Sequence, residues 1–173
     1  YHNCSLSHAR NIGLNYVRGK CIAFPDDDCW YEPATLSFVF KAFQEGLDGI
    51  IGRGINKEGL ASSTFGDKSQ FITKYEHCGA ISYSIFLRFN SKLKFDENLG
   101  VGSSLGLSSG EETDYLINFM NAFANPKVYY DMNLIIHHPI GKSEYFANDV
   151  KKTYFYSRGF GYLLKKHHYP IHK

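Results

Sequence analysis

The chain has 173 residues, of which 43% are hydrophobic, so it can bury one sizeable core. Its formal net charge of +2 is too small to argue for binding to nucleic acid or to an anionic membrane. No apolar run approaches the roughly 20 residues of a membrane-spanning helix. The chain begins at Tyr1 without a starting Met, and we interpret it as a piece of a longer protein.

The first elements alternate between helix and strand. Ser7 is expected to cap a helix that ends at Gly19, and residues 20–24 read as a buried strand. A second helix is expected from Pro33 to Glu45, and the next strand over residues 48–53. The residues expected to face inward are Ala9, Ile12, Gly13, Tyr16 and Val17 in the first helix, and Leu36, Val39, Phe40 and Phe43 in the second. This order predicts a layered α/β sheet.

Three consecutive carboxylates, Asp26, Asp27 and Asp28, lie in the loop between the first strand and the second helix. The carboxyl edge of the strands is where open α/β sheets bind ligands. Neighbouring carboxylates repel one another unless a cation or solvent screens them. A divalent metal is the economical explanation, and a metal at this edge indicates a phosphorylated substrate.

The second half of the chain is less regular. We expect a strand over residues 79–87, a third helix after Gly110, and two short strands, Val128–Tyr130 and Leu134–His137. A last helix, about residues 144–168, is expected to be interrupted at Gly159 and Gly161. Because no linker separates these elements, we predict a single domain over residues 1–173.

A second acidic group, Glu111, Glu112 and Asp114, opens the third helix. Acidic side chains there are favoured by the helix dipole alone. The functional alternative is that the preceding Gly/Ser loop delivers a carboxylate to a cleft as a general base, which requires it to be ionised.

Histidines and cysteines carry weaker signals. His137 and His138 end a strand, and a pair with one histidine packed and the other solvated is favoured over metal binding. The four cysteines, Cys4, Cys21, Cys29 and Cys78, show no C-x-x-C spacing, which argues against zinc and is consistent with reduced thiols in the cytoplasm.

Several motifs together resemble the inverting family-2 glycosyltransferases, which have the GT-A fold. The first group is Ser7-x-Ala9-Arg10-Asn11-x-Gly13, residues 19–24, and Asp26-Asp27-Asp28-x-x-Tyr31-x-Pro33. The second is Phe95-Asp96-Glu97-Asn98-Leu99-Gly100-x-Gly102 with Glu111-Glu112-Thr113-Asp114. Each motif alone is weak, and their occurrence in the family's order makes the resemblance specific.

The resemblance implies roles for individual residues. Asp28, with Asp26 directly or through water, would hold Mg²⁺ or Mn²⁺ on a nucleotide-diphosphate sugar, matching the family's D-x-D motif. Asp27, Arg10 and Asn11 would lie near the donor. Glu112 occupies the position of the family's catalytic base, but a Glu-Glu pair replaces the usual Glu-Asp, so the choice between Glu111 and Glu112 stays open. The remaining residues, on the acceptor side, would be Asp96, Glu97 and Asp114.

The resemblance also implies a wider function. The protein would transfer a sugar to a hydroxyl of a saccharide or lipid-linked acceptor, with inversion, in bacterial surface polysaccharide synthesis. It would work in the cytoplasm at the inner face of the membrane, without nucleic acid. The family's N-terminal nucleotide-binding strands are not visible, so we expect the 173-residue chain alone to be inactive. The alternatives are a sugar nucleotidyltransferase and a non-catalytic carbohydrate- or calcium-binding module.

Overall fold

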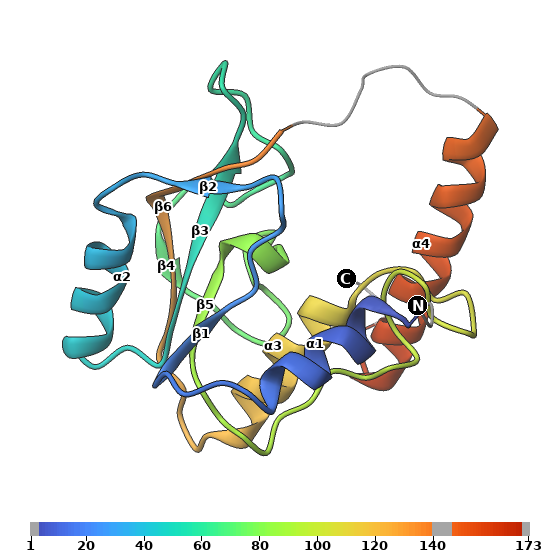
Figure 1. Cartoon of the computed structure of the whole chain (residues 1–173), viewed down its shortest axis with the longest axis horizontal. Coiled ribbons are helices and arrows are strands. Elements are labelled where there is room, and N and C mark those ends of the chain that lie inside the picture. Colours follow the sequence, from blue (N-terminus) through green and yellow to red (C-terminus); the bar gives the residue numbers. More distant parts are fainter. Residues whose placement is uncertain (1–3, 140–146, 171–173) are drawn as a thin grey trace. The chain divides into compact units, whose positions relative to one another are not determined.

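The chain divides into two compact units (Figure 1). The computed structural model describes residues 4–139 and 147–170. Unit 1 combines residues 1–18, 90–121 and 142–173, and unit 2 combines residues 19–89 and 122–141. The interpretation of residues 1–173 as a single domain stays a prediction.

Unit 2 is built on a mixed sheet whose strands follow the order β1-β5-β3-β6-β2, with β4 pairing to another part of β6. β3 and β6 are parallel, and the other pairs are antiparallel. The strands are β1 Cys21–Ala23, β2 Trp30–Tyr31, β3 Gly49–Ile55, β4 Gln70–Phe71, β5 Ile85–Arg88 and β6 Val128–His137. The predicted α/β class is confirmed.

Two strand predictions were wrong in detail. The two short strands expected near the end of the sheet form one strand, β6, whose pairing with β3 shifts register between Ile51 and Arg53. The strand expected over residues 79–87 begins with a 3₁₀ turn, Ser82–Ser84, and β5 follows it. The turn forms because the Ser84 hydroxyl donates to the backbone oxygen of Ile81 at 2.8 Å, a local bond that competes with strand pairing.

Helix α2, Thr35–Gln44, packs against this sheet. Val39 and Phe43 are buried with Ile50 and Phe86, as expected for an amphipathic helix. Leu36 and Phe40, however, are 59% and 63% exposed, so their predicted burial was wrong. The buried stripe runs instead through Thr35, Val39, Ala42 and Phe43.

The predicted buried strand, residues 20–24, is the short edge strand β1. Cys21 is exposed and Ile22 and Ala23 are half-buried, so the prediction of burial was wrong. β1 lies at the end of the strand order and pairs with β5. Leu36 and Phe40 line an open hollow with Ile22, which explains why their side chains are exposed.

Unit 1 contains the helices α1, Leu6–Leu14, α3, Glu111–Ala122, and α4, Ala147–Lys166. Ser5, and not Ser7, caps α1, because its side chain accepts from the backbone of His8 at 3.2 Å. Ser7 is buried and donates to the backbone oxygen of Leu99 at 2.6 Å. The helix ends at Leu14 instead of Gly19. Most of the residues expected on its inner face are exposed, so that prediction was wrong: Ala9, Ile12, Gly13 and Tyr16.

Helix α4 is continuous where an interruption at Gly159 and Gly161 was expected. Gly159 is buried, and a Cβ atom there would lie 2.5 Å from the backbone oxygen of Ser109. A glycine is therefore needed for close packing of α4 on this loop. Residues 144–146, the start of the predicted helix, lie outside the described residues. Within the described part of the chain, no helix is long and apolar enough to cross a membrane.

The C-terminal end of α4 is attached to the rest of unit 1 by a largely buried charge network. Lys166 Nζ lies 2.7 Å from Asp96 Oδ2 and 2.9 Å from Asp114 Oδ1. His167 Nε2 lies 2.6 Å from the same oxygen of Asp114. Because the Asp114 side chain is fully buried, its charge depends on these partners.

Candidate active site

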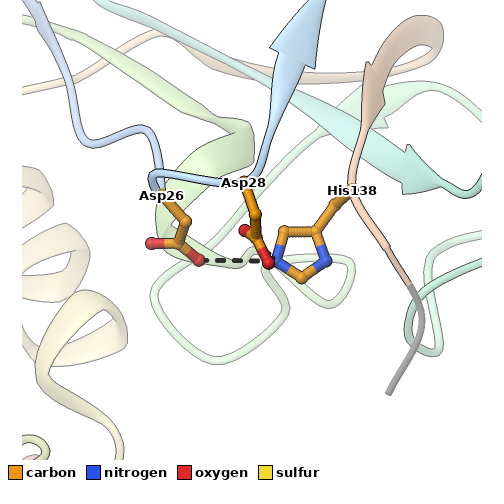
Figure 2. Close-up of side chains that lie close together, drawn as sticks. All are labelled: Asp26, Asp28 and His138. Atoms are coloured by element: carbon orange, nitrogen blue, oxygen red, sulfur yellow. Dashed lines mark ion pairs between the residues drawn. The ribbon is translucent and has the colours of Figure 1, made fainter. Parts of the chain in front are cut away.

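The acidic loop of unit 2 is held beside the end of β6 by strand pairing. Trp30 and Tyr31 of β2 pair with His137 and Ile136 of β6. This pairing places the preceding loop, which contains Asp26 and Asp28, beside His138 (Figure 2). His138 is the residue that follows β6. The backbone of His138 is itself fixed, because its N–H donates to the oxygen of Ile55 at 2.9 Å. A short β2 therefore lies between the acidic loop and α2, where a direct strand-to-helix loop was expected.

Asp26, Asp28 and His138 form a cluster that we call the acidic–histidine cluster. His138 Nε2 lies 3.2 Å from Asp28 Oδ1 and 3.7 Å from Asp26 Oδ2. One ligand atom of each residue lies within 4.8 Å of the other two. The side chains are 36%, 54% and 22% exposed in that order, so an ion can reach them from solvent. Two carboxylates and one imidazole suit Mn²⁺, and the carboxylates alone suit Mg²⁺.

The ring of His138 is oriented by its neighbours. Tyr83 stacks on it with ring centroids 4.5 Å apart and planes 13° apart. The Tyr83 hydroxyl is hydrogen-bonded to Ser62 Oγ at 2.5 Å. A Cβ atom on Gly54 would clash with Tyr83 and Ser62, so the glycine in β3 makes room for this pair. Burial raises the pKa of Tyr83, which keeps its hydroxyl neutral as a hydrogen-bonding group.

The two adjacent histidines have different environments. His137 stacks on Trp30 at 4.9 Å and its Nε2 lies 2.6 Å from Glu32 Oε1. His137 is therefore the packed histidine of the pair. His138 lies in the cluster with Asp26 and Asp28, so the less favoured alternative, a histidine beside a possible metal site, describes its position better. The signal for it in the sequence was its position at the end of a strand.

Unit 1 holds the second acidic group, where Glu111 and Glu112 begin α3 as predicted. Arg10 Nη1 lies 3.2 Å from Glu111 Oε1, and the two side chains are only 12% and 9% exposed. An ion pair this well shielded from solvent is stronger than one at the surface. Arg10 thus pairs with the first glutamate of the couple.

Glu112 is in an unusual environment for a carboxyl group. The residue keeps some exposure, but its Oε2 atom is buried and makes no hydrogen bond within the described residues. Burial, and then the neighbouring Glu111 carboxylate, raise the pKa of Glu112 to about 8. The carboxyl is therefore mostly protonated at pH 7, and it becomes ionised as the pH rises through about 8.

The other predicted residues of unit 1 have contacts that hold the fold. Asn11 accepts from the backbone N–H of Phe95 at 2.8 Å and donates to Glu97 Oε1 at 2.9 Å. Asp96 and Asp114 both bind Lys166. Their donor-side and acceptor-side roles stay predictions, as does the exposed Asp27 near a donor.

The two acidic groups belong to different compact units: Asp26, Asp28 and His138 to unit 2, and Arg10, Glu111 and Glu112 to unit 1. Their convergence on one cleft, which catalysis requires, therefore also stays a prediction.

Comparison with known proteins adds evidence that does not depend on these distances. Sixteen chains of solved structures match, among them S. aureus TarS 1–349, with a TM-score of 0.53 and 18% sequence identity. That match covers 78% of this chain and 40% of TarS 1–349, and it confirms the predicted GT-A-like fold. No curated protein matches significantly. The sequence profile of glycosyl transferase family 2 matches residues 2–99, which is more than half of the chain. The chain therefore belongs to glycosyl transferase family 2.

Proposed function

We propose that this chain is the core of a metal-dependent, inverting glycosyltransferase that passes a sugar from a nucleotide-diphosphate donor to an acceptor hydroxyl. The acceptor is a saccharide or a lipid-linked acceptor. The transfer takes place in the cytoplasm at the inner face of the membrane, as part of surface polysaccharide synthesis. The observation that carries the proposal is the acidic–histidine cluster of Asp26, Asp28 and His138 in a chain of this family.

In this proposal, the cluster holds Mg²⁺ or Mn²⁺ on the diphosphate of the donor. A divalent cation there stabilises the negative charge that develops on the leaving diphosphate. Asp26 and Asp28 supply oxygen ligands and His138 supplies a nitrogen. Tyr83 fixes the imidazole plane by stacking, so His138 meets an ion without losing much rotational freedom.

Glu112 takes the proton from the acceptor hydroxyl, and Glu111 remains paired with Arg10. A base whose pKa lies near the working pH combines a useful ionised fraction with a strong affinity for the proton. The raised pKa of Glu112 therefore suits it to this role. The ionised form that accepts the proton is favoured by a higher pH, or by the approach of a cation or a substrate. We therefore propose Glu112, and not Glu111, as the base.

The two alternative functions are less well supported. A sugar nucleotidyltransferase also needs an acidic metal site on an α/β sheet, and a calcium-binding module needs exposed carboxylates. Membership of glycosyl transferase family 2 favours sugar transfer over both. A calcium module also gains nothing from an imidazole ligand, because calcium prefers oxygen.

A titration of the purified chain with Mn²⁺, followed by the paramagnetic signal of free Mn²⁺, tests the cluster directly. We expect binding by the native chain and loss of binding in Asp28→Asn. The matched control is Asp67→Asn, because Asp67 is an exposed carboxylate of the same unit outside the cluster. Equal binding by Asp28→Asn and the native chain would contradict the proposed metal site.

A second titration, with UDP-sugars and GDP-sugars in the presence of Mn²⁺, tests the donor. It requires the protein at its natural length, because the chain covers only 40% of the TarS structure it matches. Donor binding that depends on Mn²⁺ and on Asp28 would support sugar transfer. Metal binding without any affinity for nucleotide sugars would favour a non-catalytic module.

A further inference from the structure

Helix α4 concentrates positive charge. Its 20 residues include five basic residues and one acidic residue, which gives a formal charge of +4, against +2 for the whole chain. One of the five, Lys166, is paired with Asp96 and Asp114, so the charge offered to a partner comes from the other four. The remainder of the chain therefore has a formal charge of −2. The small net charge of the protein hides a strongly basic helix in an otherwise acidic chain.

The same helix exposes large apolar side chains that do not contribute to the core. Val150 is 73% exposed, Tyr154 61%, Phe160 52% and Tyr156 38%. At about 100° per residue, these four lie within an arc of roughly 160° on the helix surface. The packed side of the helix carries Gly159 and Leu163, which are buried against the loop at Ser109 and Gly110.

The basic residues border this apolar arc on both sides. Lys152 lies at one border, with its Nζ atom 5.3 Å from the ring centroid of Tyr156. Arg158 lies at the other border, 5.8 Å from the ring centroid of Tyr154. Lys151 and Lys165 lie on the same side as Arg158 by helical spacing, and both are exposed.

The loop that packs against the middle of α4 adds another apolar side chain. A Cβ atom on Gly106 would lie 2.9 Å from the Phe155 ring and 3.1 Å from Arg158, so this loop runs closely along the helix. Leu105, the preceding residue, is 51% exposed.

We propose that the exposed face of α4, formed by Val150, Tyr154, Tyr156 and Phe160 and bordered by Lys151, Lys152, Arg158 and Lys165, docks onto an anionic lipid surface. Helices that lie in the membrane interface combine an apolar face with flanking lysine and arginine. Tyrosine suits this depth because its ring is apolar and its hydroxyl is polar. The excess charge of α4 selects a negatively charged surface over a neutral one. The inference does not depend on the proposed sugar transfer.

Cosedimentation of the whole 173-residue chain with lipid vesicles tests this inference. We expect binding to vesicles of phosphatidylcholine with about 30% phosphatidylglycerol. Binding to phosphatidylcholine alone should be much weaker, and added salt should weaken binding to the anionic vesicles. Neutralising Lys151 and Lys152 in the double variant K151Q/K152Q should weaken that binding about 30-fold, at about tenfold per 1.4 kcal/mol.

The apolar face is tested by the double variant V150S/Y154S, which should weaken binding to the anionic vesicles by at least about tenfold. Matched controls are Lys41→Gln and Leu60→Ser, because these exposed side chains of unit 2 lie outside the face. Both controls should bind as the native chain does. Circular dichroism of every variant shows whether the helices are retained, since the substituted side chains are all exposed.

Three results would overturn the inference. One is equal binding to neutral and anionic vesicles, and another is unchanged binding by both double variants. The third is self-association of the chain that both double variants abolish while vesicles bind nothing, because the face would then join two copies of the protein.

Discussion

The acidic–histidine cluster of unit 2 and the glutamate couple of unit 1, Glu111 and Glu112, differ in how far their carboxyl groups are exposed to solvent. Asp26 and Asp28 are exposed to solvent and contact one another through His138. Glu112, by contrast, has a carboxyl oxygen that is sealed from solvent and makes no hydrogen bond within the described residues. A carboxylate that reaches solvent is accessible to a cation, whereas a desolvated carboxyl binds a proton tightly.

This difference agrees with the division of work that sugar transfer needs. A cation site has to exchange its ion or its substrate with solvent, so exposed ligands are an advantage. A general base has to be ionised before it reacts, and it then has to bind the proton strongly, which a desolvated site favours. The environment of each carboxylate, more than its residue type, therefore separates the two proposed roles.

The largest effect is expected from Glu112→Gln in the protein at its natural length. Sugar transfer should fall by about 10² to 10⁴-fold, because the acceptor hydroxyl loses its base. Binding of the donor with Mn²⁺ should not change. A transfer rate close to that of the native enzyme would show that the wrong carboxylate was chosen, and Glu111→Gln would then be the next variant to measure.

The next largest effect is expected in the pH dependence of sugar transfer. Only the ionised form of Glu112 accepts a proton, and its pKa is raised to about 8. The value of kcat/KM should therefore rise about 50-fold from pH 6 to pH 8, in proportion to the ionised fraction. Glu112→Gln should remove this rise from any residual activity. A flat profile over the same range would argue against a protonated Glu112 in the free enzyme.

A smaller effect is expected from His138→Gln. Removing one of three ligand atoms should weaken Mn²⁺ binding roughly tenfold, which is about 1.4 kcal/mol. His137→Gln is the matched control, since His137 stacks on Trp30 and bonds Glu32. If both variants bind Mn²⁺ as the native chain does, the imidazole of His138 has no part in the site.

The smallest expected effect is on stability. A carboxyl whose pKa is higher in the folded state binds more protons there than in the unfolded state, so stability falls as the pH rises between the two pKa values. For Glu112 that window runs from its ordinary value of 4.5 to about 8. Without solvent screening, the loss between pH 5 and pH 8 would be about 3 to 4 kcal/mol. Because Glu112 keeps some exposure, we expect Glu112→Gln, which removes this loss, to gain only on the order of 1 kcal/mol over the native chain at pH 8 relative to pH 5. Urea unfolding at both pH values measures this difference, and a gain at pH 5 equal to that at pH 8 would contradict it.

The parts of the fold that depend on local sequence were predictable. Pro33 and Gly46 placed α2 close to its observed limits, and Gly110 placed the start of α3. The acidic loop was found because its three aspartates are consecutive. Helix faces were harder, because the prediction turned α2 by about one residue and so directed Leu36 and Phe40 inward.

The features that were missed depend on pairing between distant segments. His138 lies beside Asp26 and Asp28 because β2 pairs with β6. No local sequence pattern predicts this pairing. The protonated state of Glu112 follows from burial, which a single sequence does not report. In the same way, the net charge of +2 gave no indication of the basic helix α4, because a sum over the whole chain does not show where the charges lie.

The anchoring of α4 by Lys166 has a practical consequence for anyone who shortens this protein. A chain that stops before Lys166 leaves the buried Asp114 without its lysine, its histidine and the packing of the last helical turn. Asp114 would then keep only the amide of Asn118, 3.0 Å from its Oδ2, as a side-chain partner among the described residues. A buried carboxylate that has lost its cationic partners is strongly destabilising. An expression boundary drawn a few residues too early should therefore lower the stability of unit 1, even though the removed segment lies far along the sequence from both acidic groups.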